Sequence, residues 1–162
     1  IDFAKKGEAA KIVFKVNSVV ESKAMQALYR ASQAGVEVKL IVRGVCSLKP
    51  GIKGVSDNIE VRSIIGRYLE HTRVYMFENG GNQEVYASSA DLMSRNMFRR
   101  VEVGFPIESK RLKQRILDDL DCYLQDNSQA WLMQSDGSYV QCVPEDDVFR
   151  VQNKLMEQYS VK

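Results

Sequence analysis

The sequence predicts a single α/β domain in which helices flank a mixed β-sheet. The chain has 162 residues, the length of one ordinary domain. A strand-like run, a helical pattern and a second strand-like run occupy 11–42. This stretch has the length of about 30 residues that is typical of a βαβ unit with parallel strands. Further strand-like runs then alternate with an amphipathic helix at 109–126, which is the pattern of an α/β fold.

Apolar runs and turn residues define the elements of the first half. Strands are expected at 11–16, 36–42, 59–65 and 72–77. Between the first two, a helix is expected at about 19–34, because Ser18 and Glu21 have the spacing of a capping box. Gly35 stands where a helix-ending glycine is expected. The residues at 43–51 include two glycines and a proline and predict a loop.

The second half combines short strands with two helices. A turn is expected at Asn79-Gly80-Gly81-Asn82, and 90–99 is polar and irregular. Strands are expected at 84–88, 101–107, 130–134 and 139–143. The last two would form a hairpin around Asp136-Gly137, a strong turn signal. Apolar residues at helical spacing predict the helix at 109–126, and a final polar helix is expected at 144–161.

Composition narrows the classes of function. The 23 Lys and Arg residues against 21 Asp and Glu residues give a net charge of +2. This balance does not argue for nucleic acid from bulk electrostatics, and we expect no nucleic-acid partner. Three cysteines without metal-ligand spacing and a single histidine predict reduced thiols and no metal site. No apolar run approaches the roughly 20 residues needed to span a bilayer, and we expect a cytoplasmic protein.

The single histidine, His71, stands in the most informative stretch of the chain. His71, Arg73 and Glu78 have the spacing of the H-x-K-x4-D motif of the phospholipase D superfamily. If 72–78 is a strand, alternation places His71, Arg73 and Tyr75 on one face. An imidazole exchanges a proton near neutral pH, and a guanidinium pairs with phosphate oxygens. The stretch therefore predicts phosphate chemistry; the alternative is a histidine that only packs at the start of a strand.

Polar side chains follow strand-like runs at other places. Arg43 follows the strand at 36–42, and Ser88-Ser89-Ala90-Asp91 ends the strand at 84–88. Further polar residues come next: Arg95, Asn96, Arg99 and Arg100. Ligand sites collect at the C-terminal ends of parallel strands, so these positions are expected near His71, although a solvated surface is the alternative for each arginine. Ser88-Ser89-Ala90-Asp91 is also a loose counterpart of the G-S-x-N element of the same superfamily, with Asp in place of Asn.

Longer stretches carry a more specific resemblance. They include Leu40-Ile41-Val42-Arg43-Gly44-Val45-Cys46-Ser47-Leu48-Lys49-Pro50-Gly51, the histidine stretch, and Ser88-Ser89-Ala90-Asp91-Leu92-Met93. In consistent order over about 11–127, the chain resembles the C-terminal domain of bacterial polyphosphate kinase. The resemblance implies a phospholipase-D-like mixed sheet flanked by helices, in a fragment of a longer enzyme. It places the end of an interdomain linker at 1–10 and the C-terminal catalytic domain at 11–162.

The resemblance also implies an activity and roles for residues. The family reversibly transfers the terminal phosphate of ATP to inorganic polyphosphate through a phosphohistidine, which would lie in the preceding domain. By position, His71 is similar to the family's catalytic proton donor or acceptor that contacts ATP, and Arg43 to its nucleotide-contacting arginine. Further candidates for phosphate contact are Arg73, Ser89, Arg95 and Arg100. Mg²⁺ would arrive with ATP and be bound mainly by the preceding domain.

The implied partners are ATP, ADP and inorganic polyphosphate. The full-length enzyme is expected to be a homo-oligomer in the cytoplasm or at the inner face of the bacterial membrane, and the isolated fragment is expected to be inactive. One alternative is a phosphodiesterase half-domain of the phospholipase D type. Glu78 at the acid position favours it, and the altered G-S-x-N element argues against it. Another alternative is a non-catalytic module that binds phosphate polymers through its arginine loops.

Overall fold

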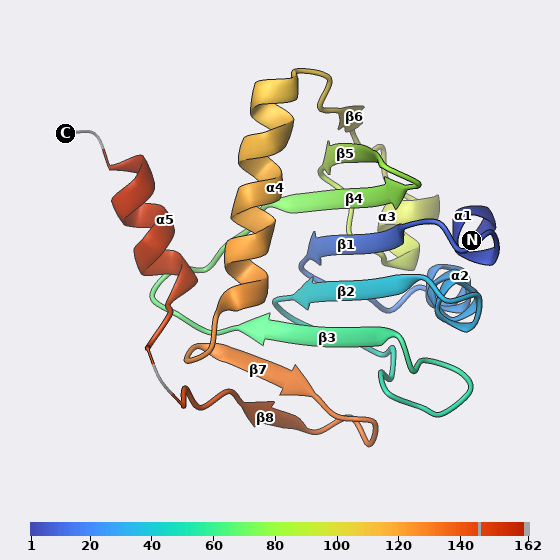
Figure 1. Cartoon of the computed structure of the whole chain (residues 1–162), viewed down its shortest axis with the longest axis horizontal. Helices are drawn as coiled ribbons and strands as arrows, with labels where there is room; N and C mark the ends of the chain where they lie inside the picture. The colour runs from blue at the N-terminus through green and yellow to red at the C-terminus, as the bar shows by residue number, and fades with distance from the viewer. Residues whose placement is uncertain (146, 161–162) are drawn as a thin grey trace.

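An eight-stranded sheet runs through the molecule in the order β6-β5-β4-β1-β2-β3-β7-β8 (Figure 1). The structure is a computed structural model that describes residues 1–145 and 147–160. The strands are β1 (Ala10–Val16), β2 (Glu37–Val42), β3 (Ile59–Ile64), β4 (Arg73–Asn79), β5 (Asn82–Ser88), β6 (Gly104–Pro106), β7 (Ala130–Met133) and β8 (Tyr139–Gln141). The helices are α1 (Asp2–Lys5), α2 (Ser22–Gln33), α3 (Ser94–Phe98), α4 (Lys110–Gln125) and α5 (Val151–Tyr159).

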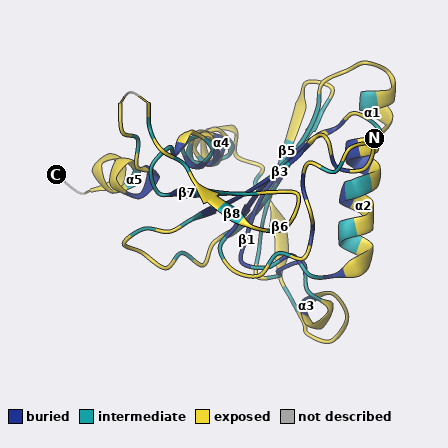
Figure 2. Cartoon of the chain, turned by 90° about the horizontal axis from the view of Figure 1, so that it is seen from below, coloured by how far each residue is buried: buried dark blue, intermediate teal, exposed yellow. Residues whose placement is uncertain are grey.

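The predicted mixed α/β sheet with a central βαβ unit is confirmed. β1 pairs in parallel with β2, and β2 with β3, whereas the remaining strand pairs are antiparallel. α1 and α2 lie on one face of the sheet, and α4 and α5 lie on the other (Figure 2). Leu28 of α2 packs with Leu40 on the first face, and Leu120 of α4 packs with Val13 on the second. The central strands read as continuous apolar runs because they are buried between these two layers.

The start of α2 differs from the prediction. The helix expected at 19–34 begins at Ser22, and Glu21 rather than Ser18 is its N-cap, with its carboxylate accepting the N–H of Ala24 at 2.7 Å. The backbone just before the helix is hydrogen-bonded to the loops that follow β2 and β5. Backbone groups that are paired with distant loops cannot also form a first helical turn, so tertiary pairing overrides the local capping pattern.

Three other elements have bounds that differ from the prediction. The stretch expected to be irregular at 90–99 contains α3, and the strand expected at 101–107 is reduced to β6. β6 pairs with β5, but Val101, which is fully exposed, lies before it and outside the sheet. The final helix expected at 144–161 is α5; positions 146 and 161 of that expectation lie outside the described residues. Its late start follows from the Val151 N–H, which donates to Asp126 rather than to a preceding helical turn.

The remaining expectations concern the turns and the first residues. The hairpin around Asp136-Gly137 is confirmed, and Gly137 has a φ of +94°, which a glycine adopts without strain. Residues 1–10 contain α1, and Ala4 packs against the core, while an interdomain linker there stays a prediction. No helix in the described part of the chain is long and apolar enough to cross a membrane.

Candidate active site

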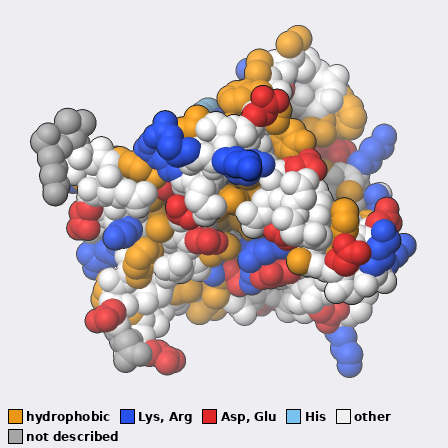
Figure 3. Space-filling view, turned by 45° about the horizontal axis from the view of Figure 1, so that its top comes forward, with side chains coloured by type: hydrophobic (Ala, Val, Ile, Leu, Met, Phe, Trp, Pro, Cys, Tyr) orange, Lys and Arg blue, Asp and Glu red, His pale blue; other side chains and the backbone are white. Residues whose placement is uncertain are grey.

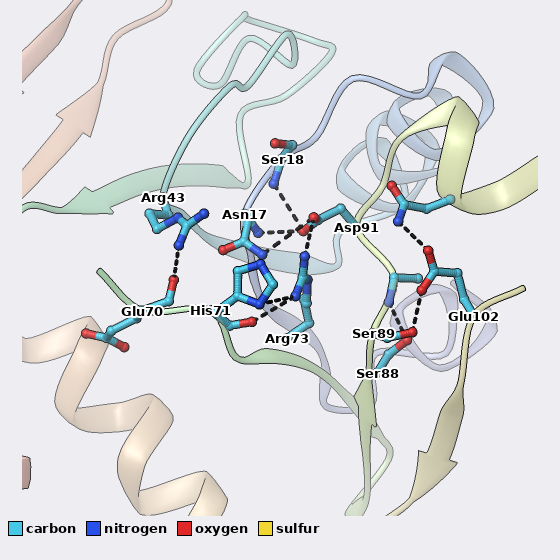
Figure 4. A network of polar contacts seen from close by, with 12 residues as sticks. Asn17, Ser18, Arg43, Glu70, His71, Arg73, Ser88, Ser89, Asp91 and Glu102 are labelled. Carbon is cyan, nitrogen blue, oxygen red and sulfur yellow. Dashed lines mark hydrogen bonds and ion pairs between the residues drawn. The ribbon is translucent and has the colours of Figure 1, made fainter. Parts of the chain in front are cut away.

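The candidate site lies at one edge of the sheet, where several strands end or begin. The register pairs Val16 with Val42 in the parallel strands and Arg73 with Ser88 in the antiparallel hairpin. Because β4 runs antiparallel to β1, its first residues lie at the same edge as the last residues of β1 and β2. The loops that carry Arg43, His71 and Ser88-Ser89-Ala90-Asp91 therefore meet there (Figure 4).

Arg73 connects His71 to Asp91. Its Nη1 lies 2.9 Å from His71 Nδ1 and donates to the His71 carbonyl at 2.9 Å, while its Nη2 donates to Asp91 Oδ2 at 2.8 Å. His71 precedes β4, so this bridge, rather than the strand alternation expected from the sequence, brings the two side chains together. A guanidinium has donors only. His71 Nδ1 must therefore accept, and the neutral imidazole carries its proton on Nε2.

Asp91 ties this bridge to the end of β1. Asp91 is only 3% exposed. Its carboxylate accepts the backbone N–H of Asn17 at 2.7 Å and that of Ser18 at 3.3 Å. Burial disfavours the charged form, but the hydrogen bond from Arg73 and the N–H of Asn17 outweigh burial and hold the pKa of Asp91 below its usual value. Asp91 is therefore a carboxylate at neutral pH, and its ion pair with Arg73 holds the guanidinium in place.

Arg43 reaches the same region from the end of β2. Its Nη1 donates to the Glu70 carbonyl at 2.6 Å, immediately before His71 in the chain. A guanidinium has five N–H donors. This is the side chain's only hydrogen bond within the described residues, so donors remain for an anionic ligand. Arg73 differs, because both its terminal nitrogens are occupied; its buried Nε has no partner among the residues described.

The serines after β5 fix their own loop. Ser88 Oγ donates to the Val103 carbonyl at 2.9 Å. Ser89 Oγ accepts the Val103 N–H at 3.0 Å and donates to the Glu102 carboxylate. Glu102 also accepts from Asn96 Nδ2 at 2.6 Å. Hydrogen bonds from Ser89 and Asn96 hold the pKa of Glu102 below its usual value, so this acidic group stays charged beside the site.

Three residues singled out from the sequence lie apart from this bridge. Arg95 of α3 and Arg100 after it are exposed, and no hydrogen bond or ion pair joins either one to His71 in the described chain. Glu78, at the acid position of the motif, lies at the other end of β4 and accepts the Gly81 N–H at 2.7 Å. It stabilises the β4–β5 turn rather than contributing a charge to the site.

A second cluster, which the sequence did not reveal, lies beside His71. The Glu70 carboxylate forms an ion pair with Lys15 Nζ at 3.0 Å. It also accepts hydrogen bonds from the hydroxyl of Tyr123 and from Gln152 Nε2, the latter at 2.8 Å. Burial of Glu70 is outweighed by the charge of Lys15 and by these hydrogen bonds, which hold the pKa of Glu70 below its usual value. Burial and the contact with Glu70 raise the pKa of Tyr123. The only feature of the sequence that could have indicated this cluster is Lys15, because a lysine inside a buried strand needs a partner for its charge.

The cluster borders a cleft with a volume of about 250 Å³. Its lining includes Lys15, Ile41, Arg43, Ile65, Glu70 and Tyr123. On the face drawn in Figure 3, basic and acidic side chains are interspersed, as the net charge of +2 suggests. A phosphate at this site must therefore be met by local donors rather than by a bulk positive field. No group of three or more His, Cys, Asp or Glu side chains able to hold a metal ion is found among the described residues.

The family model and the individual relatives that match this sequence agree with one another. A family model described as "Polyphosphate kinase C-terminal domain 2" matches residues 1–152. The polyphosphate kinase of Burkholderia vietnamiensis is 60% identical over 140 residues, covering 86% of this chain and 20% of the relative. That of Pseudomonas aeruginosa is 57% identical over 138 residues, covering 85% of this chain and 20% of the relative. The chain thus spans about a fifth of the length of these curated relatives.

Solved structures agree with the sequence relatives. The crystal structure of polyphosphate kinase from Porphyromonas gingivalis matches with a TM-score of 0.93 and 36% identity, covering 97% of this chain and 24% of that one. Nuc, a phospholipase D family member from Salmonella typhimurium, matches with a TM-score of 0.59 and 16% identity, covering 82% of this chain and 87% of that one. The second likeness shows the fold alone, and it confirms the expected phospholipase-D-like sheet.

Proposed function

The chain belongs to the family of polyphosphate kinase C-terminal domains, and from this premise we propose that it forms one wall of an ATP-dependent phosphotransferase site. The full-length enzyme would transfer the terminal phosphate of ATP to inorganic polyphosphate, reversibly, through a phosphohistidine in the preceding domain. The observation that supports this proposal most strongly is the Arg73 bridge, which holds the one histidine of the chain next to Arg43 at the edge of the sheet.

The proposed chemistry follows from the protonation that the bridge imposes. In phosphoryl transfer from ATP to the histidine of the preceding domain, an N–P bond forms and gives the phosphohistidine, the bond between the γ-phosphorus and the β–γ bridging oxygen breaks, and the electron pair of that bond stays on the oxygen of ADP. The Nε2–H of His71 would donate to that oxygen as its negative charge develops, and Arg43 would neutralise the phosphates. In the reverse direction the same donors stabilise the attacking ADP oxygen.

The other candidate residues have different proposed tasks. Arg73 holds His71, and we propose that it serves phosphate through its positive charge and through the N–H groups that the bridge leaves without a partner, on Nε and Nη2. Ser89 orders the loop after β5, and Arg95 and Arg100 would meet more distant phosphates of the polymer, since both are exposed. Mg²⁺ would neutralise the phosphates of ATP. From the family resemblance, we propose that it is bound mainly by the preceding domain.

Paired assays of the full-length enzyme test the function. His71→Ala should lower polyphosphate synthesis from ATP by about two orders of magnitude, the scale of general acid–base catalysis, with little change in the thermal melt. The wild-type enzyme should show no hydrolysis of a chromogenic phosphodiester. Robust diesterase activity that depends on His71 would favour the phosphodiesterase alternative. Unchanged synthesis by His71→Ala would remove this residue from the mechanism.

A further inference from the structure

His71 sits on a connection that has no regular secondary structure of its own. Residues 65–72 join β3 to β4, and this connection leaves the sheet toward α5 before it returns (Figure 1). Much of it is exposed, with Leu69 at 81% and Ile65 at 63%. Apolar packing therefore contributes little to its position. A residue that acts on a phosphate must nevertheless be held within a fraction of an ångström, so specific polar contacts have to fix this segment.

Gln152 of α5 supplies such contacts. Its Nε2 donates to the Tyr68 carbonyl at 2.9 Å, and its Oε1 accepts the Tyr68 N–H at 2.9 Å. The side-chain amide thus pairs with both backbone groups of one residue, as a neighbouring strand would. Nε2 also donates to Glu70 Oε1 at 2.8 Å. Gln152 is 5% exposed, so these hydrogen bonds are shielded from competition by water.

The sequence of the connection is fitted to this amide. A Cβ on Gly66 would lie 2.4 Å from Gln152 Oε1 and 2.8 Å from its carbonyl carbon. Only glycine at position 66 lets the amide approach the connection so closely. On its own side, α5 packs against α4 through Val151 and Leu155, which belong to the hydrophobic layer on that face of the sheet. Gln152 therefore reaches the connection from a fixed support.

Glu70 transmits this contact to the site. Its carboxylate accepts a hydrogen bond from Gln152 and another from Tyr123 of α4, and it forms an ion pair with Lys15 of β1. Its backbone carbonyl accepts a hydrogen bond from Arg43, and His71 follows it directly in the chain. In Figure 4 the Glu70 carboxylate points away from the imidazole, toward the helix side, while its carbonyl faces Arg43. Glu70 thus links α5 to both residues that are proposed to meet ATP.

We propose that α5 is a strap and that Gln152 is a positioning residue, which holds the 65–72 connection so that His71 and Arg43 face the same phosphate. Gln152 acts through Glu70 and touches neither of the two residues directly. The inference rests on the proposed role of His71. Loss of the amide should leave the fold standing but let the connection move, and a displacement of about 1 Å at a catalytic group can cost about 100-fold in rate.

The test uses the full-length enzyme and two glutamines of the same helix. Gln152→Met keeps the side-chain length and removes its hydrogen bonds. We expect kcat for polyphosphate synthesis to fall by about 10- to 100-fold, with KM for ATP changed by less than about threefold. Amide hydrogen exchange of the peptide covering 65–72 should accelerate, while that of the central strands stays unchanged. Gln158→Met is the matched control, because Gln158 is exposed and its side chain forms one hydrogen bond among the described residues, to Tyr159; this variant should match the wild type in all readouts.

A second variant separates position from packing. Gln152→Glu keeps an acceptor for the Tyr68 N–H but has no donor and places a carboxylate beside Glu70, so its kcat should be as low as that of Gln152→Met or lower. Wild-type kcat in both variants, with His71→Ala inactive, would overturn the strap but not the proposed function. Wild-type synthesis by His71→Ala would remove His71 from the mechanism, and hydrogen exchange of 65–72 in Gln152→Met would then still decide whether Gln152 holds the connection. Faster exchange across the whole sheet with loss of soluble enzyme would assign Gln152 to the fold and also overturn its positioning role.

Discussion

Arg73 shows at the scale of a residue why arginine and lysine differ at this site. Its guanidinium spans His71 Nδ1 at 2.9 Å and Asp91 Oδ2 at 2.8 Å. A lysine keeps the charge, but its single ammonium group cannot span both partners in this planar arrangement. Arg73→Lys in the full-length enzyme should therefore lower kcat for polyphosphate synthesis by about tenfold or more, measured at saturating ATP.

The control for this variant is Arg111→Lys. Arg111 lies exposed on α4, and its side chain forms no hydrogen bond or ion pair within residues 1–145 and 147–160. Its replacement should leave kcat unchanged. Wild-type turnover by Arg73→Lys would mean that positive charge at this position suffices and that the bridge between the two partners is not required.

Two carboxylates should make the free energy of unfolding decrease at acidic pH. The pKa values of Asp91 and Glu70 are both lowered in the folded protein. Their stabilisation is complete above the unfolded values, near pH 4, and is lost as pH falls through the lower folded values. The free energy of unfolding, measured in urea between pH 7 and pH 3, should therefore drop below about pH 4. Asp91→Asn should make this drop smaller; an identical pH profile for the variant would contradict the assignment.

At the residue scale, part of the site was predictable from sequence. Arg43, His71 and Ser88-Ser89-Ala90-Asp91 follow or precede strands, and the rule that ligand sites collect at strand ends brought them together correctly. Gln152 could not be found in this way. It lies 84 residues from Tyr68, and neither its position nor its neighbours in the sequence distinguish it from an ordinary helix residue.

Among the elements, long periodic patterns were predicted well and tertiary contacts explain the errors. β1, β2 and α4 have strong apolar patterns and lie where expected. The start of α2 was wrong because the backbone before it pairs with distant loops. The start of α5 was wrong because the Val151 N–H is taken by Asp126. Such pairings are invisible to local propensity.

Asp126 joins three elements and is the strongest candidate for a structural hub. Its Oδ1 accepts three backbone N–H groups at the start of β7, from Ser128 at 3.1 Å, Gln129 at 2.7 Å and Ala130 at 2.9 Å. Its Oδ2 accepts the first N–H of α5, from Val151 at 2.8 Å. Asp126→Ala would leave these buried and half-buried donors unpaired and should lower the free energy of unfolding by about 3 kcal/mol, measured by urea denaturation.

Asp136→Ala provides the comparison for this hub. Asp136 is exposed in the β7–β8 turn and accepts hydrogen bonds only from Ser138 in the described structure. Because water can replace those contacts, the loss of Asp136 should lower the free energy of unfolding by clearly less than the loss of Asp126. Equal effects of the two substitutions would contradict the view that Asp126 organises the end of α4, β7 and α5 together.

For the whole molecule, the open position of the site leads us to expect that this chain does not act alone. Arg43 and His71 lie at an edge of the sheet, and the chain covers about a fifth of its curated relatives. We expect the isolated 162-residue chain to synthesise polyphosphate from ATP at less than about one hundredth of the full-length rate, because the proposed phosphohistidine lies elsewhere. Full-rate synthesis by the chain alone would contradict a shared site.

The most direct measurement follows the first chemical step in the full-length enzyme. Rapid-quench experiments with ATP labelled in its γ-phosphate report the rate at which the phosphoenzyme forms, separately from chain elongation. If His71 donates to the departing ADP oxygen, His71→Ala should slow phosphoenzyme formation by at least about 100-fold, yet the same histidine of the preceding domain should still become labelled. Phosphoenzyme formation at the wild-type rate in His71→Ala would contradict the proposed role of His71 in ADP departure.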